Sequence, residues 1–212
     1  MKTVYILCEG QAEQHFVQEI LTDIAEKKGI YIYAPLVTTK VANKKFVGGV
    51  ASYSKIRNDL VKLCNHSEAI VTTMFDLYGL PKDTPGYSAP QQSHYDWAVS
   101  IETAVNADIG TRNIHFNLVV HEFEALLFTN PSVFRDYNKD VVEVMEKSLR
   151  SANGNPESIN SGYDTSPSHR ITRVYQGYSK PITGVIMAKR IGLDRIRASC
   201  HHFNEWLISL GL

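Results

Sequence analysis

The sequence is poor in cysteine and has no long apolar run. Its three cysteines, Cys8, Cys64 and Cys200, lie far apart and form no C-x-x-C pair. Neither a disulfide framework nor a cysteine zinc site is therefore expected, and all three are predicted to be buried thiols. The first apolar stretch ends at Glu9 and is too short for a signal-peptide core, and no segment approaches the roughly 18 apolar residues of a membrane span. We expect a cytoplasmic protein with no membrane partner.

The sequence also lacks net charge, with 22 basic and 22 acidic residues among 212. This balance argues against a protein that coats nucleic acid. The two signs are unevenly spread, because residues 1–168 carry 15 Lys and Arg against 20 Asp and Glu, whereas residues 169–212 carry 7 against 2. An acidic body with a basic tail is compatible with a metal site beside a phosphate-binding surface, or with charge matching inside the molecule.

Alternating apolar runs and amphipathic periods predict an α/β fold, a parallel sheet of about four strands flanked by helices. The expected strands are residues 4–8, 30–37, 69–75 and 114–120, the expected helices 11–28, 52–65, 94–108, 181–191 and 194–210, and the expected loops 38–52 and 77–93. The Asn-, Ser-, Gly- and Pro-rich residues 151–168 are expected to be a linker or surface loop. We therefore expect an α/β core, 1–150, with a helical C-terminal extension, 151–212, packed on it as one domain.

Acidic residues follow three of the expected strands at the point where each strand ends. Glu9 follows the first strand, Asp76 the third, and Glu122 and Glu124 the fourth, and Glu13 lies one helical turn beyond Glu9. Ligands bind at the carboxyl ends of parallel strands, so these side chains are expected to converge. Carboxylates brought together repel unless a cation neutralises them, and oxygen ligands select Mg²⁺ or Mn²⁺. The pattern predicts a metal-supported phosphoryl site; the alternative is that each acid caps a helix.

The basic C-terminal part contains candidate phosphate contacts. Arg170 is the first choice, because a guanidinium group binds two phosphate oxygens at once, and Lys180 is a further candidate. His121 lies in H-E-F-E-A, which lacks the second histidine of the zinc-protease motif H-E-x-x-H, so it is expected to orient or pack rather than to bind metal. For Tyr87 and Trp97, packing in the core or a loop is expected in preference to stacking on bases.

Six segments in this order resemble the bacterial DUF4276 family across almost the whole chain. They are E-G-Q-A-E-Q-H-F (9–16), D-L-Y-G-L-P (76–81), H-E-F-E-A-L-L-F (121–128), N-P-E-S-I-N (155–160), S-P-S-H-R-I (166–171) and I-G-L-D-R-I-R-A-S-C-H-H-F-N-E-W-L (191–207). That family is similar to Toprim domains, the catalytic modules of topoisomerases, primases and OLD-type nucleases. The resemblance implies a Toprim-like fold in which Glu9 matches the glutamate after the first strand, Glu13 the second acid of OLD-type sites, and Asp76 the first residue of an Asp-x-Asp motif.

The sequence departs from that motif at one ligand. Position 78 is Tyr78, where Asp-x-Asp has its second aspartate. Glu122 or Glu124 would have to supply the missing ligand, so the expected metal ligands are Glu9, Asp76, Glu122 and Glu124. The genes of this family also look like neighbours of genes for AAA or SMC-like ATPases in defence-type gene clusters. This resemblance implies an ATPase partner.

The expected function is a Toprim-like, Mg²⁺- or Mn²⁺-dependent phosphodiesterase, a nuclease acting on DNA or RNA as the effector partner of an ATPase. Glu9, Glu13, Asp76 and Arg170 are the expected catalytic residues. Two alternatives stay open. One is a non-catalytic subunit that keeps the Toprim-like fold and binds a ligand for the ATPase, and the other is a hydrolase of a small phosphorylated metabolite.

Overall fold

The computed structural model describes residues 2–38, 52–88, 93–159 and 165–212. They form two compact units, residues 1–118 with Leu212 (unit 1) and Val119–Gly211 (unit 2). The division falls after Leu118, whereas the sequence placed the end of the α/β core near residue 150. No helix in the described ranges is long and apolar enough to cross a membrane. The α/β fold class is confirmed, as the arrangement of unit 1 shows.

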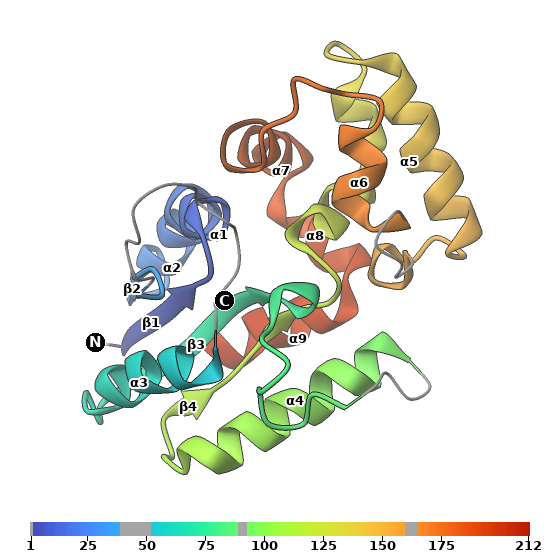
Figure 1. The fold of residues 1–212 in the computed structure, drawn as a ribbon. Coiled ribbons are helices and arrows are strands. Elements are labelled where there is room, and N and C mark those ends of the chain that lie inside the picture. The colour runs from blue at the N-terminus through green and yellow to red at the C-terminus, as the bar shows by residue number, and fades with distance from the viewer. Residues whose placement is uncertain (1, 39–51, 89–92, 160–164) are drawn as a thin grey trace, which may run out of the picture. The chain divides into compact units, whose positions relative to one another are not determined.

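Unit 1 is built on a parallel sheet with the strand order β2-β1-β3-β4 (Figure 1). The strands are β1 (Lys2–Cys8), β2 (Ile30–Tyr33), β3 (Ala69–Asp76) and β4 (Ile114–His115), and β5 (Leu118–Val119) also pairs with β3. From β1 the chain adds β2 on one side and then β3 on the other. The strand order therefore reverses between β1 and β3, which is the point where open α/β sheets bind ligands.

Helices cover both faces of this sheet, as right-handed crossovers in opposite directions require (Figure 1). On one face lies a continuous helix made of α1 (Gln11–Phe16), the π-helical η1 (Val17–Leu21) and α2 (Thr22–Glu26). Gly29, with φ of 71°, then reverses the chain into β2. On the other face lie α3 (Tyr53–Cys64) and α4 (His94–Ile109).

The fourth expected strand is interrupted. Residues 114–120 were predicted as one strand, but the structure has β4 and β5 with Phe116 and Asn117 between them. At the break, backbone amides donate to side chains instead of to a neighbouring strand. The amide of Phe116 donates to Oδ1 of Asn106 at 2.8 Å, and the amide of Asn117 donates to Oγ1 of Thr73 at 2.9 Å. Expected β2 is also shorter, ending at Tyr33, with Leu36 forming an isolated bridge.

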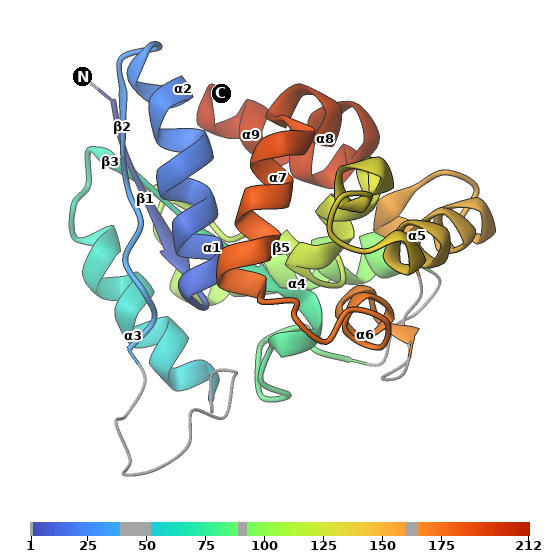
Figure 2. The same cartoon turned by 90° about the horizontal axis from the view of Figure 1, so that it is seen from above.

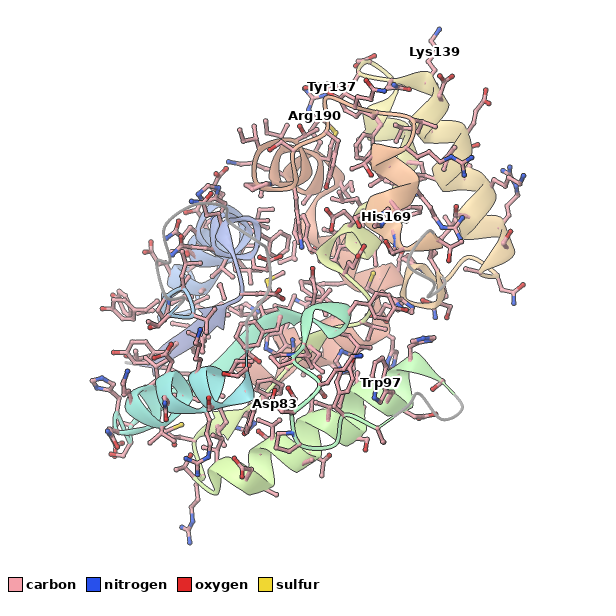
Figure 3. The ribbon with its side chains drawn as sticks, viewed as in Figure 1. Asp83, Trp97, Tyr137, Lys139, His169 and Arg190 are labelled. Atoms are coloured by element: carbon pink, nitrogen blue, oxygen red, sulfur yellow. The ribbon has the colours of Figure 1, made fainter. Side chains whose placement is uncertain are left out.

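The loop that follows β3 holds the start of α3 in place. Ser52 precedes α3, but its side chain makes no capping hydrogen bond within the described residues. Instead both carboxylate oxygens of Asp83 accept from the amide of Tyr53, at 3.1 and 3.2 Å (Figure 3). The hydroxyl of Tyr53 donates to Asp108 of α4 at 2.8 Å. The loop after β3 is thus connected to both helices of that face.

Unit 2 is helical and is organised around the buried segment η3 (Phe123–Thr129). Its other elements are η4 (Pro131–Phe134), α5 (Lys139–Ser151), η5 (Pro156–Ser158), α6 (Pro167–Thr172), η7 (Lys180–Gly184), α7 (Val185–Ile191), α8 (Leu193–Ser199) and α9 (His201–Leu210). The helices α5 to α8 all pack against η3. The apolar run 125–128 therefore forms the core of this unit.

In unit 2 the sequence missed one helix, and one of its predicted helices needs correction. The sequence did not single out α5, which begins at Asn138, whose side chain accepts from the amides of Asp140 and Val141. The single helix expected over 194–210 is two helices, α8 and α9, separated by Cys200 in an extended conformation. The N-cap of α8 is Gly192 with φ of 84°, and Asp194 lies inside the first turn. Gly192 also follows the last residue of α7, Ile191, where the expected helix 181–191 ends.

Candidate functional site

Glu9 and Asp76 lie at the carboxyl ends of the neighbouring strands β1 and β3. The register pairs Cys8 with Met74, so the two strands reach this edge of the sheet together. The amide of Glu9 donates to the carbonyl of Met74 at 3.2 Å, and Oε2 of Glu9 accepts from the amide of Asp76 at 3.0 Å. The Glu9 carboxylate is therefore held across the junction of the two strands. We call Glu9, Glu13 and Asp76 together the acid edge.

Gly79 makes room for the Glu9 carboxylate. It is the last residue of the short helix η2 (Leu77–Gly79), directly after β3. A Cβ at this position would lie 2.6 Å from Oε1 and 2.9 Å from Oε2 of Glu9, closer than real Cβ contacts. Any side chain here would displace the carboxylate. The sequence analysis missed this role, although the glycine three residues after the strand-ending acid was a usable signal.

Glu13 is buried in the first turn of α1, one turn beyond Glu9. The N-cap Gly10 is extended, and a Cβ on it would lie 3.2 Å from Oε2 of Glu13, so the side chain folds back against the turn. Burial, with a smaller contribution from the charge of Glu13, raises the pKa of the Cys8 thiol far above its usual range. Cys8 therefore stays protonated beside the carboxylates.

The donor chemistry of the acid edge fits a hard divalent cation. Its side chains present only carboxylate oxygens, which Mg²⁺ and Mn²⁺ prefer. Over the described ranges, no three or more His, Cys, Asp or Glu side chains are arranged to hold a metal ion among themselves. Mg²⁺ usually takes one or two protein carboxylates and completes its shell with waters and substrate phosphates. Glu9 and Asp76 fit that open type of site rather than a closed protein cage.

Glu122 has a partner of its own in unit 2. Its Oε2 accepts from the amide of Ser168 at 2.8 Å, in the first turn of α6. Ser166 is the N-cap of the same helix and accepts from the amide of His169. The contact of Glu122 is thus a helix cap, the alternative that the sequence left open for each strand-end acid.

Glu124 is paired with a lysine. The side chain of Glu124 is 3% exposed, and its Oε2 lies 3.6 Å from Nζ of Lys180. Its Oε1 accepts from the hydroxyl of Tyr178 at 3.2 Å, and Nζ of Lys180 also lies 5.7 Å from the centroid of the Phe123 ring. Lys180, a candidate phosphate contact in the sequence, therefore neutralises a buried carboxylate.

Arg170 joins α6 to α5. Its Nε donates to the carbonyl of Thr165 at 2.7 Å and its Nη1 to Oγ of Ser148 at 3.1 Å. The expected site residues thus fall into two sets, with Glu9, Glu13 and Asp76 in unit 1 and Arg170 in unit 2 with the two glutamates described above. Within the first set, the hydrogen bond between Glu9 and the amide of Asp76 joins two of the acids, and Glu13 lies one helical turn beyond Glu9.

His121 and Glu157 have structural contacts. His121 is fully buried with φ of 69°, and its Nε2 is hydrogen-bonded to the carbonyl of Glu157 at 3.1 Å. The carboxylate of Glu157, which sequence reasoning missed, accepts from the amides of His202 and Phe203, each at 3.0 Å, and so caps α9. A packing role for His121 agrees with these contacts.

An aromatic cluster adjoins the acid edge within unit 1. Tyr78 of η2 meets His94 edge to face with ring centroids 6.1 Å apart, and Trp97 contacts both His94 and Tyr87. Trp97, labelled in Figure 3, is buried, in line with a packing role. Burial lowers the pKa of His94 below its ordinary value, so the ring is neutral at pH 7.

Comparison with known proteins gives a family match. The family described as "Domain of unknown function (DUF4276)" matches residues 8–211, from the last residue of β1 to the end of unit 2. No curated protein and no solved structure gives a significant match.

Proposed function

The chain belongs to the DUF4276 family, and on that premise we propose that it is a divalent-cation-dependent phosphodiester hydrolase, a Toprim-like nuclease acting in the cytoplasm. The observation that carries the proposal is the placement of Glu9 and Asp76 at the ends of β1 and β3, joined by a 3.0 Å hydrogen bond. The role as effector partner of an ATPase rests on the family resemblance alone.

The position of the pair supports a ligand site. The strand order reverses between β1 and β3, and in open α/β sheets the crevice at this reversal is where ligands bind. The amide of Asp76 and the space left by Gly79 fix the Glu9 carboxylate before any ligand arrives. A site whose charges are already oriented loses little free energy to reorganisation during a reaction.

The proposed roles follow from the donor atoms. Bound Mg²⁺ or Mn²⁺ supplies polarisation of phosphoryl oxygens and a lowered pKa for an attacking water. Glu9 and Asp76 bind the cation through their carboxylates, and Glu13, one turn away, accepts the proton or holds a second ion. Arg170 of unit 2 is a proposed phosphate contact on the strength of the sequence alone, and its guanidinium has five N–H donors, more than the bonds to Thr165 and Ser148 use.

The first experiment is a titration of Mn²⁺ into the wild-type protein, Glu9→Gln and Asp76→Asn, with circular dichroism to check each fold. Glu68→Gln is the matched control, because Glu68 is exposed and precedes the opposite end of β3. We expect a saturable site in the wild type and the control, and at least a tenfold loss of affinity in the two acid-edge variants.

The second experiment measures cleavage of labelled DNA and RNA oligonucleotides with Mg²⁺ or Mn²⁺. The acid-edge variants should lose at least a hundredfold in rate while Glu68→Gln keeps the wild-type rate. A folded Glu9→Gln protein that binds Mn²⁺ and cleaves like the wild type would overturn the proposal.

One observation favours a second candidate, the non-catalytic subunit. The side chain at the position of the second aspartate is Tyr78, whose ring packs against His94 and supplies no carboxylate. If the wild type neither binds Mn²⁺ nor cleaves any of the oligonucleotides, this candidate replaces the first.

A further inference from the structure

Three aromatic rings form a row across the sheet of unit 1. Tyr5 of β1 stacks on Tyr33 of β2, with ring centroids 5.3 Å apart and planes inclined by 25°. Tyr5 also stacks on His66, at 5.2 Å and 28°. Tyr5 and Tyr33 are register partners, and His66 precedes β3, which lies on the other side of β1 from β2. The rings therefore follow one another in the order Tyr33, Tyr5, His66, and we call them the aromatic row.

The row ends in solvent at Tyr33. β2 is the outermost strand of the described sheet (Figures 1 and 2), and Tyr33 is 55% exposed. Tyr31 lies two residues earlier on the same side of β2 and is 41% exposed. Within the described part of the chain, the hydroxyls of Tyr31, Tyr33 and Tyr5 make no hydrogen bond. The Tyr33 end of this stack of rings is thus accessible to a further planar group.

We propose that the aromatic row binds unpaired bases of single-stranded nucleic acid, an inference that rests on the proposed nuclease function and names its substrate class. A base laid on the outer face of Tyr33 extends the stack by one ring. Base–aromatic stacking tolerates any sequence, because every base has a flat π-face. A base pair inside a duplex has no free face to offer, so the row selects single strands.

Cationic side chains lie close to the row in the chain. Lys62, one turn before His66 on α3, has a side chain that is 73% exposed, and Lys27 is exposed in the turn that leads into β2. Lys62 also pairs with Asp59 at 3.2 Å, but such a surface pair is weak and competes poorly with a polyanion. These two lysines are the basic groups that we expect the phosphates flanking a stacked base to contact, and an apolar peptide would not use them.

The row and the acid edge share a strand. Tyr5 precedes Glu9 by four residues on β1, which corresponds to roughly 13 Å at the strand rise of about 3.3 Å per residue. A chain whose base rests on the row therefore reaches the acid edge within a few nucleotides. The row would hold the substrate strand while its phosphodiester lies at the carboxylates.

The test measures binding without cleavage. Fluorescence anisotropy of labelled oligo(dT) and oligo(U) is followed in the Glu9→Gln background with EDTA, beside a duplex of equal length. Tyr33→Ala and Tyr33→Leu should weaken single-strand binding at least fivefold, whereas Tyr33→Trp should preserve it. Tyr137→Ala is the control, since Tyr137 is 43% exposed in unit 2 and its ring lies 5.0 Å from the guanidinium of Arg190 (Figure 3).

Crosslinking locates the contact. An oligonucleotide carrying 5-iododeoxyuridine should crosslink to Tyr33 or Tyr31 on irradiation, as peptide mass spectrometry would show. Equal affinity of Tyr33→Ala and its background, duplex binding as tight as single-strand binding, or no binding at all would overturn the inference.

The outcomes separate the inference from the proposed function. If single strands bind through Tyr33 but the wild type never cleaves, the binding site stands and the nuclease proposal fails. If the wild type cleaves in a Glu9-dependent manner and Tyr33→Ala binds as tightly as its background, the nuclease proposal stands and the binding site fails.

Discussion

The carboxylate of Glu9 accepts a hydrogen bond from the backbone amide of Asp76, at 3.0 Å. This contact connects the ends of β1 and β3 and leaves the Asp76 carboxylate out of the bond. Glu9→Gln retains an oxygen that can accept from the same amide, and Asp76→Asn leaves the amide unchanged. The charges of the two acids can therefore be removed one at a time while the geometry of the strand ends is kept.

Gly79→Ala should disturb the metal site without touching a ligand. The added Cβ would lie 2.6 Å from Oε1 of Glu9, so the carboxylate must move, and overpacking of this kind costs about 1–3 kcal/mol of stability. We expect Mn²⁺ affinity to fall at least tenfold in calorimetric titration. In a Glu9→Gln background the same change should cost no further affinity, and a second full loss there would contradict this account.

Asp83→Ala should destabilise unit 1 by about 1 kcal/mol, the usual cost of a lost helix cap, because the amide of Tyr53 loses its acceptor. Urea unfolding followed by circular dichroism measures this change. Ser52→Ala is the comparison, since the Ser52 side chain does not cap α3, and it should lie within 0.5 kcal/mol of the wild type. The reverse ranking of the two variants would show that Ser52 is the cap in solution.

Lys180→Met should destabilise unit 2 by roughly 2 kcal/mol. It leaves the buried Glu124 carboxylate without its cation, and the cost stays below the 3–5 kcal/mol of a fully buried pair because Lys180 is 28% exposed. The double variant with Glu124→Gln should recover part of the loss in thermal unfolding. Arg150→Met, which breaks an exposed pair with Glu146, should change stability by less than about 0.5 kcal/mol.

His94 should make the protein less stable in mild acid. Burial lowers the pKa of His94 in the folded protein below the ordinary 6.5. In mild acid the unfolded chain therefore binds a proton at this residue that the folded chain does not. The contribution of His94 to the free energy of unfolding is unchanged above pH 6.5. It is lost as the pH falls from 6.5 toward the pKa of His94 in the folded protein. His94→Gln should show a smaller drop in urea stability between pH 7.5 and pH 5.5 than the wild type. An equal drop in both proteins would exclude this origin.

The elements with their own local signals were predictable. β1, α1 and α4 carry clear apolar periods, and α7 ends at Ile191, as expected. What the sequence did not show is controlled by residues distant in the chain. Asp83 caps a helix that begins thirty positions earlier, and Glu157 accepts from the amides that start α9, which divides the single helix expected there. Local sequence patterns do not indicate contacts between residues so far apart in the chain.

Only part of the candidate site was predictable from the sequence. Glu9 and Asp76 come together because they end adjacent parallel strands, which strand order alone can indicate. Glu122 and Glu124 were grouped with them on the assumption that the fourth strand runs directly into these acids. The strand is short, the chain enters unit 2 at Val119, and the two glutamates there have their own partners, Ser168 and Lys180.

The buried thiol of Cys8 bears on how the protein responds to oxidants. Peroxide attacks thiolates, and burial raises the pKa of Cys8, and of Cys64 and Cys200 as well, so that each sulfur stays protonated. The carboxylates of the acid edge have no redox chemistry at all. The sulfur next to the acid edge is therefore expected to react slowly with peroxide.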